Sequence, residues 1–97
     1  MRAKDHLTQT HAALEALDHE AIDRAGTTLV EALDRGGVIY TCGNGGSAAE
    51  ALHLVEEVIG CYGNRARPAR AAVCLNADPT TLTCIANEFG YENVFSR

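Results

Sequence analysis

The first third of the chain carries apolar residues at helical spacing. They recur at intervals of three, four or seven positions, as Leu7, Leu14 and Leu17, and then as Ile22, Ala25, Leu29 and Leu33. This period predicts one helix from Ala3 to about Leu17 and a second from Glu20 to about Asp34, with Asp18 between them as an N-cap. We therefore expect residues 1–36 to form a helical hairpin or a broken long helix, which Gly36 ends.

Two short apolar runs, Val38–Cys42 and Ala71–Leu75, have the length and composition of buried strands. Between them, Ser47 and Glu50 have the spacing of a capping box, so we expect a helix to begin at Ser47. One face of that helix is apolar and the opposite face is polar. The apolar face consists of Ala48, Ala51, Leu52, Val55, Val58 and Ile59, and the polar face carries Glu50, His53 and Glu57.

The last part of the chain predicts a second strand-to-helix unit. Asp78 and Pro79 are a favoured N-cap and first helical residue, and the helix that they open is expected to reach about Asn87. Gly90 breaks it, and another helical pattern begins over Tyr91–Arg97. Alternating strands and helices predict an α/β fold with a parallel sheet, right-handed crossovers and both faces covered. Two strands are too few for such a sheet, so we expect more strands, or another chain, to complete it.

His53 and Glu57 stand one helical turn apart, so both side chains could reach one metal ion or one substrate atom. A catalytic zinc usually has three protein ligands, so this pair cannot complete such a site alone. The alternative is an ordinary surface pair that stabilises the helix by a few tenths of a kcal/mol. Spacing alone favours that alternative.

The segment Gly43–Gly46 is a Gly-rich turn between the first expected strand and the helix after it. Such a turn directs backbone N–H groups and the positive end of the helix dipole at an anion, so it suits a phosphate or a sugar oxygen. It lacks the lysine of a P-loop and the glycine spacing of a dinucleotide fold, so nucleotide binding is poorly supported. The alternative is a tight βα turn in which Ser47 acts only as a cap.

Two further groups of polar residues have open roles. Asn87 and Glu88, at the end of the last expected helix, could lie near a ligand or simply on the surface. Arg65, Arg67 and Arg70 could attract a phosphorylated substrate, although solvated loop charges are more common. Neither group decides a function by itself.

The composition is that of an ordinary globular chain and sets limits on function. With 97 residues, 46% of them hydrophobic and 22% charged, it can bury one small core, so we expect one domain or part of one. A formal charge of −5 argues against a broad nucleic-acid surface. No apolar run approaches the roughly 20 residues that span a bilayer and no signal-peptide pattern is present, so a cytoplasmic protein without a membrane partner is expected. The cysteines (Cys42, Cys61, Cys74 and Cys84) form no C-x-x-C pair and are expected to be reduced and mostly buried.

Several separate motifs together resemble the phosphoheptose (sedoheptulose-7-phosphate) isomerases, which are built on the sugar-isomerase (SIS) domain. The motifs are Cys42–Ala49, His53 with Glu56 and Glu57, Leu82–Tyr91 and Val94–Arg97. The resemblance runs from about Ala12 to the last residue and is specific, because the motifs stand in the family's order and at its spacing. It implies that residues 1–36 are a helical lead and oligomerisation segment, and that residues 37–97 are the first half of a flavodoxin-like parallel sheet with flanking helices.

The resemblance also implies a role for each of the candidate sites described above. Contacts to the substrate would come from Asn44, Gly45, Gly46, Ser47, Glu57, Asn87 and Glu88. His53 and Glu57 would bind zinc, and Glu57 would also be the catalytic base. The implied reaction converts sedoheptulose 7-phosphate to an aldoheptose 7-phosphate, an early step toward the heptoses of bacterial lipopolysaccharide, in a homotetramer.

Two departures from the family pattern, and one missing part, limit what this chain is expected to do alone. Cys61 stands where many relatives have an arginine after the metal-binding helix, and Glu88 replaces an aspartate. The family's phosphate loop and its later Gln and His ligands belong to a second half that these residues do not include, so the polypeptide alone is not expected to be a working enzyme. Two alternatives stay open: a non-catalytic SIS protein that binds a partner such as a replication initiator, and a phosphosugar sensor. The His53–Glu57 pair favours the isomerase, because a pure binding module has no need of it.

Overall fold

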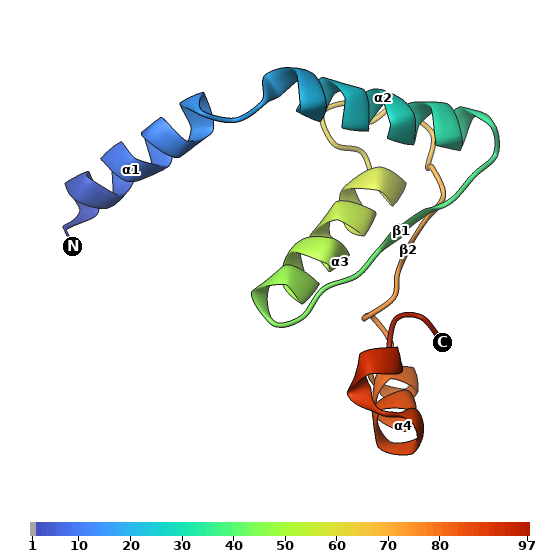
Figure 1. Cartoon of the computed structure of the whole chain (residues 1–97). Coiled ribbons are helices and arrows are strands. Elements are labelled where there is room, and N and C mark those ends of the chain that lie inside the picture. Colours follow the sequence, from blue (N-terminus) through green and yellow to red (C-terminus); the bar gives the residue numbers. More distant parts are fainter. Residues whose placement is uncertain (1) are drawn as a thin grey trace. The chain divides into compact units, whose positions relative to one another are not determined.

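Residues 2–97 are described by a computed structural model, in which helices and a small parallel sheet alternate along the chain (Figure 1). In chain order the elements are α1 (Ala3–Glu15), α2 (His19–Asp34), β1 (Ile39–Thr41), α3 (Gly46–Ile59), β2 (Ala72–Cys74), α4 (Pro79–Phe89) and the 3-10 helix η1 (Tyr91–Asn93). The chain divides into two compact units, one up to Val30 and one from Glu31 onward. The expected α/β class is confirmed.

The first unit contains α1 and most of α2. Asp18 accepts a hydrogen bond through Oδ1 from the backbone N–H of Ala21 at 3.0 Å, so it is the N-cap of α2, as predicted. The two helices make no contact with each other, so they correspond to the expected broken helix and not to a packed hairpin. No residue of either helix is buried within the described chain, and of the apolar positions predicted for the two helices only Leu33 packs against the core described below. None of the helices in residues 2–97 has the length and apolar character needed to cross a membrane.

The second unit is built around two parallel strands, β1 and β2, with Ile39 opposite Ala72 in their register. Helix α3 packs on one face of this pair. The buried core draws on all three elements and consists of Ile39, Ala51, Val55, Ala72 and Cys74, against which Leu33 and Val58 also pack. Because the buried face of α3 is held against the strands, the position of its opposite face is set as well.

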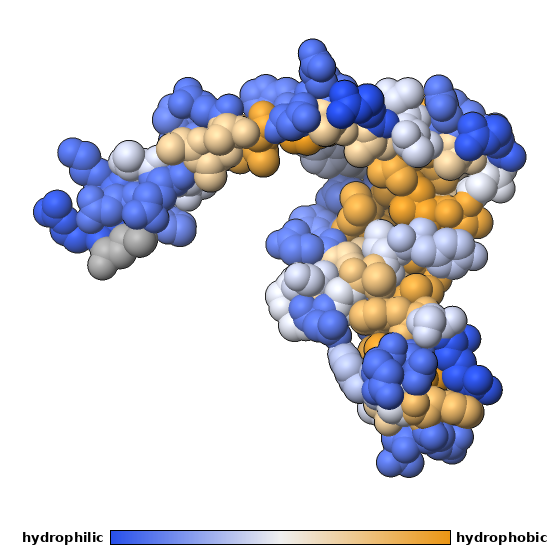
Figure 2. Space-filling model, viewed as in Figure 1, coloured by the Kyte–Doolittle hydropathy of each residue, from blue (hydrophilic) through white to orange (hydrophobic). Residues whose placement is uncertain are grey.

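The second face of the sheet is open, which corrects the expectation of two fully buried strands. Tyr40 is 63% exposed and Val73 is 44% exposed, whereas the residues beside them in β1 and β2 face α3. Side chains alternate between the faces of a strand, so this pattern follows from a helix on one side only among the described residues. Figure 2 shows apolar surface where β1 and β2 run. Completion of the sheet by further strands stays a prediction.

The start of α3 differs from the expectation. Its N-cap is Gly45, with φ of 55°, and no side chain caps the helix, so the expected capping box of Ser47 and Glu50 is wrong. The backbone provides the reason, because the carbonyl oxygen of Asn44 already accepts a hydrogen bond from the N–H of Ser47 at 2.9 Å. A glycine is favoured at position 45 because other residues rarely adopt this positive φ.

Two other helix ends agree with the sequence prediction. Gly36, with φ of 82°, ends α2 in the left-handed conformation that glycine favours after a helix. Asp78 caps α4, because its Oδ1 accepts hydrogen bonds from the backbone N–H groups of Thr80 at 2.9 Å and Thr81 at 3.3 Å. The helix that it opens continues to Phe89, slightly beyond the expected end.

All four cysteines are free thiols, but only Cys74 is buried. Cys42, Cys61 and Cys84 are exposed, so the expectation of mostly buried cysteines is wrong for these three. Cys42 and Cys61 lie just beyond β1 and α3, and Cys84 lies on a face of α4 that nothing in residues 2–97 covers. An apolar run in the sequence therefore did not identify which residues face the core.

Candidate active site

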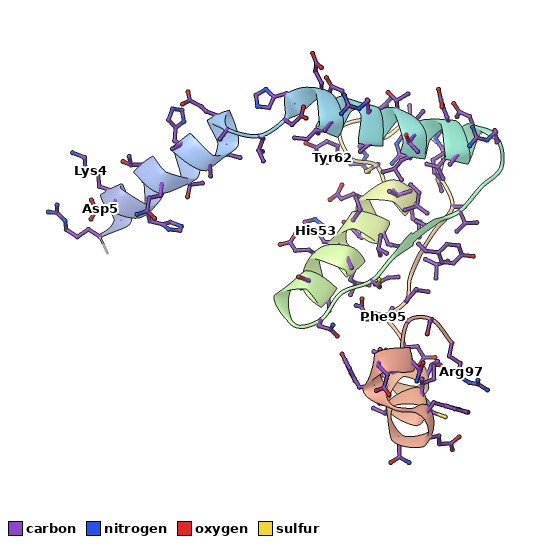
Figure 3. All side chains as sticks on the ribbon, in the orientation of Figure 1. Lys4, Asp5, His53, Tyr62, Phe95 and Arg97 are labelled. Atoms are coloured by element: carbon purple, nitrogen blue, oxygen red, sulfur yellow. The ribbon has the colours of Figure 1, made fainter. Side chains whose placement is uncertain are left out.

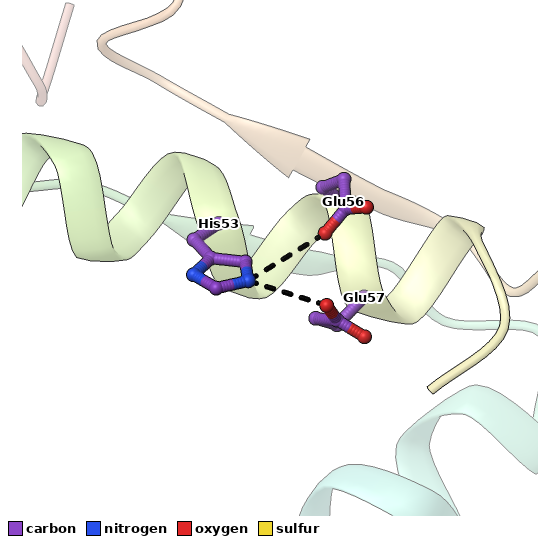
Figure 4. Close-up of side chains that lie close together, drawn as sticks. All are labelled: His53, Glu56 and Glu57. Atoms are coloured by element: carbon purple, nitrogen blue, oxygen red, sulfur yellow. Dashed lines mark hydrogen bonds and ion pairs between the residues drawn. The ribbon is translucent and has the colours of Figure 1, made fainter. Parts of the chain in front are cut away.

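Three side chains of the types that can bind a metal ion gather on α3. Nε2 of His53 lies 3.2 Å from Oε1 of Glu57 and 3.7 Å from Oε2 of Glu56 (Figure 4). One ligand atom from each of the three residues lies within 4.8 Å of the others. In Figure 3, His53 projects from α3 on the side away from β1 and β2. The structure thus brings the predicted pair together and adds Glu56, which sequence reasoning had not assigned as a ligand although it stands one turn from His53.

The donor atoms of this cluster fit a divalent metal ion. One imidazole nitrogen and two carboxylates are ligands that zinc accepts, and catalytic zinc sites commonly use three protein ligands. The side chain of Glu57 is 33% exposed, while that of His53 is 68% exposed. Glu57 is therefore the most enclosed member of the cluster, whereas His53 faces solvent within residues 2–97. Exposed groups of this kind also occur without a metal, so the cluster alone does not establish one.

The Gly-rich turn leaves three consecutive backbone donors free. Within residues 2–97, the N–H groups of Asn44, Gly45 and Gly46 make no hydrogen bond, while those of Ser47 and Ala48 donate back to Asn44. All three free donors precede or begin α3, where the helix dipole adds partial positive charge. The turn therefore has unpaired backbone donors at Asn44, Gly45 and Gly46, while the N–H of Gly43 is bonded to Asn76. Binding of an anion or a sugar oxygen there stays a prediction.

An open groove of about 470 Å³ runs beside this turn. It is lined by Tyr40, Thr41 and Cys42 at the end of β1 and by Ser47, Glu50, Ala51 and Leu54 on the first half of α3. At 100° per residue, Glu57 lies about 20° around α3 from Glu50 and about 10 Å further along the axis, but about 80° around the helix from Ser47. The groove thus borders the turn at the start of α3, and the cluster of His53, Glu56 and Glu57 lies further along the same helix.

Residues from the C-terminal part of the unit also reach the turn. The hydroxyl group of Tyr91 in η1 donates a hydrogen bond to Oδ1 of Asn44. This contact occupies the carbonyl side of the Asn44 amide and leaves its NH2 group available. Asn87 and Glu88 are exposed on α4 and their side chains make no hydrogen bond or ion pair within residues 2–97, so their roles stay predictions. Tyr91 was not singled out as a site residue, because nothing in its spacing indicates that η1 lies against the turn.

Two of the three loop arginines have structural contacts. Arg70 forms an ion pair with Asp34, with Nη2 at 2.7 Å from Oδ1. Arg67 donates hydrogen bonds to the carbonyl oxygens of Glu57 and Val58 at the end of α3, at 2.9 and 3.0 Å. Arg65 is exposed and forms no ion pair among the described residues. Arg67 and Arg70 are thus engaged in structural contacts. Only Arg65 is left for the predicted attraction of a phosphorylated substrate by this loop.

Comparison with known proteins gives one consistent result. The family of SIS domains matches residues 4–97. The phosphoheptose isomerase of Tolumonas auensis is 42% identical over 83 residues, which are 86% of this chain and 42% of that protein. The phosphoheptose isomerase of Helicobacter hepaticus is 47% identical over 77 residues, which are 79% of this chain and 39% of that protein. The chain thus spans less than half the length of these two relatives.

Solved structures show the same likeness in three dimensions. The structure of phosphoheptose isomerase GmhA from Neisseria gonorrhoeae matches with a TM-score of 0.79 at 33% identity, over 96% of this chain and 46% of that one. A phosphoheptose isomerase from Francisella tularensis matches with a TM-score of 0.80 at 27% identity, over 99% of this chain and 53% of that one. About half of each of these folds corresponds to the present chain.

Proposed function

Because the chain belongs to the phosphoheptose isomerase family of SIS-domain proteins, we propose that the whole protein interconverts sedoheptulose 7-phosphate and an aldoheptose 7-phosphate. One observation carries this proposal beyond the family likeness. The same helix, α3, has free backbone donors for an anion or a sugar oxygen at its start and a His–Glu–Glu cluster two turns later. A module that only binds a protein partner has no need of the second feature.

The proposed reaction is a proton transfer between adjacent carbons through an enediol. It requires a base near C1 and C2, stabilisation of the oxygen that gains negative charge, and anchoring of the distant phosphate. We assign the base to Glu57, whose carboxylate is the most enclosed of the cluster and lies 3.2 Å from Nε2 of His53, while Arg67 binds the backbone carbonyl oxygen of the same residue. The catalytic base would thus stand on a rigid helix and not on a mobile loop.

Substrate contacts would come mainly from the turn. The unpaired N–H groups of Asn44, Gly45 and Gly46 would donate to substrate oxygens, and the hydroxyl of Ser47 lines the adjoining groove. Asn87 and Glu88 would contact the substrate from α4. The extra methylene of Glu88, relative to aspartate, changes the reach of that carboxylate.

Zinc is the metal that we propose for the cluster. His53 and Glu57 would hold it, with Glu56 beside them as a further carboxylate on the same helix, and residues outside these 97 would complete its coordination. Bound there, the metal would supply positive charge to a developing oxyanion. Phosphate anchoring is likewise assigned to residues outside this chain, because its own loop arginines are largely committed to structural contacts.

The remaining parts of the proposal concern assembly and cellular setting. We propose a cytoplasmic homotetramer that acts in lipopolysaccharide heptose biosynthesis, with no nucleic-acid or membrane partner. The exposed apolar residues Leu7, Leu14 and Ile22 of α1 and α2 support self-association, since lone helices rarely leave such positions uncovered. Light scattering on the dilute full-length protein should give a mass of several chains, and a single-chain mass would contradict the assembly.

The reaction can be tested directly by isotope exchange. Full-length protein is incubated with sedoheptulose 7-phosphate and zinc in D2O, with unphosphorylated sedoheptulose as the control. Proton transfer through an enediol should form the aldose and incorporate solvent deuterium at the reacting carbons, which NMR detects. Binding without conversion or exchange would favour the sensor, and the absence of binding would favour the non-catalytic partner-binding protein.

A further inference from the structure

We propose that Asn76 is a positioning residue that holds the Gly-rich turn in its ligand-binding form. Asn76 follows β2, far from the turn in sequence. Its Oδ1 accepts a hydrogen bond from the backbone N–H of Gly43 at 2.9 Å. Its Nδ2 donates a hydrogen bond to the carbonyl oxygen of Ala48 at 3.2 Å. One side chain thus joins the first residue of the turn to the first turn of α3.

The two partners of Asn76 determine which kind of side chain can do this. A backbone N–H only donates and a backbone carbonyl only accepts, so the side chain between them must accept at one end and donate at the other. A carboxamide does both with two adjacent atoms, whereas a carboxylate only accepts. Asn76 is partly buried, so losing either bond would leave a backbone group with restricted access to water.

The turn between the two clamped points is the part that matters for the ligand. Asn76 binds outside the segment Asn44–Gly46, whose three N–H groups remain unpaired. A second close contact supports the same geometry, because a Cβ on Gly43 would lie only 2.5 Å from the carbonyl oxygen of Ser47. The backbone of the turn is therefore folded tightly onto α3, and Asn76 ties that fold to the neighbouring strand end.

The role of Asn76 rests on the proposed function only where it concerns the phosphosugar. Clamping of the turn can be measured without any ligand, through hydrogen exchange of the Gly43 amide. Ligand binding can then be measured through the separate changes in KM and kcat. A merely structural residue would lower stability and zinc affinity together, whereas a clamp on the turn should leave the His53–Glu57 cluster two turns away unaffected.

The experiment compares Asn76→Ala and Asn76→Asp in the full-length protein, with Asn64→Ala as the control. The side chain of Asn64 accepts a bond only within its own loop, from the N–H of Ala66 at 3.0 Å. Asn76→Ala should speed exchange of the Gly43 amide at least about tenfold and raise KM for sedoheptulose 7-phosphate by about tenfold, with kcat and zinc affinity nearly unchanged. Asn76→Asp should keep the Gly43 amide protected, because a carboxylate still accepts its bond, and should still raise KM.

Two results for Asn76→Ala would overturn the proposal. One is a Gly43 amide that stays as protected in Asn76→Ala as in the parent protein. The other is a KM in Asn76→Ala no different from that of Asn64→Ala. If Asn76→Ala does not fold, as judged by circular dichroism, loss of Gly43 protection in Asn76→Asp would equally contradict the clamp. If the parent protein does not bind the phosphosugar, the proposed function fails, while Gly43 exchange still decides whether Asn76 holds the turn.

Discussion

The guanidinium group of Arg67 donates a hydrogen bond to the backbone carbonyl oxygen of Glu57, at 2.9 Å from Nη2. The same side chain reaches the carbonyl oxygens of Val58 at 3.0 Å and Gly60 at 3.3 Å. The last carbonyls of a helix have no partner within it and carry the negative end of the helix dipole, so a cation there satisfies both needs. Arg67 therefore supplies the cation at this end of α3.

Replacing Arg67 with Met should destabilise the protein by about 1–3 kcal/mol, because it removes charge-assisted bonds to several carbonyls but keeps the aliphatic stem. Urea unfolding of the full-length protein measures the loss. Arg65→Met is the matched control, since Arg65 has no ion pair in the described residues, and it should change stability by less than about 0.5 kcal/mol. Equal effects of the two substitutions would show that Arg67 does not secure the end of α3.

Asp78 should make the stability of the protein sensitive to acid. The hydrogen bond from the Thr81 side chain, followed by the backbone N–H groups of Thr81 and Thr80, lowers the pKa of Asp78 below its usual value of 3.8. Because the folded-state pKa is the lower one, this stabilisation is complete above the unfolded-state pKa and is lost as pH falls through the folded-state pKa.

The variant Asp78→Asn tests this contribution. An asparagine can still cap α4 but does not titrate, so unfolding free energy should fall less steeply with acid below about pH 4 in the variant than in the parent. The comparison requires thermal or urea unfolding at several pH values. Parallel curves for the two proteins throughout the acid range would contradict the assigned role of Asp78.

The parts of the fold that the sequence predicts well are those that depend on local patterns. Asp18 and Asp78 cap helices because each offers an oxygen to N–H groups a few residues away, which spacing alone reveals. Ser47 is not the cap of α3, because Gly45 is the N-cap with a positive φ and the carbonyl oxygen of Asn44 accepts the first hydrogen bond. The sequence pattern does not indicate this backbone conformation.

In the candidate site, too, local contacts were predictable from the sequence and contacts between distant segments were not. The His53–Glu57 pair follows from one turn of helix and was predictable. Asn76 and Tyr91 reach the Gly-rich turn from segments far along the chain, so only the pairing of β2 with β1 and the position of η1 in space bring them there. The exposure of Tyr40 and Val73 could not be predicted from the sequence either, because an apolar strand has the same sequence pattern whether one or both of its faces are covered.

The glycines of the turn should respond differently to a side chain. Around Gly46 a Cβ would meet no atom within 4 Å, whereas at Gly43 it would lie 2.5 Å from the carbonyl oxygen of Ser47. Gly46→Val should therefore abolish phosphosugar binding with little loss of helix content, because the side chain would occupy the approach to the unpaired N–H groups. Gly43→Ala should instead cost about 1–3 kcal/mol of stability through overpacking.

Calorimetric titration with sedoheptulose 7-phosphate and circular dichroism separate these effects. Gly45→Val is a third variant, in which blocked access combines with a strained φ of 55°. Binding that survives both Gly45→Val and Gly46→Val in a folded protein would leave the turn with a structural role only.

Replacement of Glu57 and replacement of His53 should have different kinds of effect on activity. Glu57→Gln keeps size and polarity but removes the negative charge and the basic oxygen, so kcat should fall by about 10²–10⁴-fold with little change in substrate affinity. His53→Ala removes one metal ligand, so it should weaken zinc binding, and excess zinc should restore part of the lost activity. No such rescue is expected for Glu57→Gln, because added metal does not replace a base.

His11→Ala is the matched control, since His11 forms an equivalent exposed pair with Glu15, at 3.4 Å from Nε2 to Oε1, on α1. If Glu57→Gln and His53→Ala both bind zinc and turn over substrate like His11→Ala, the pair on α3 is an ordinary surface contact.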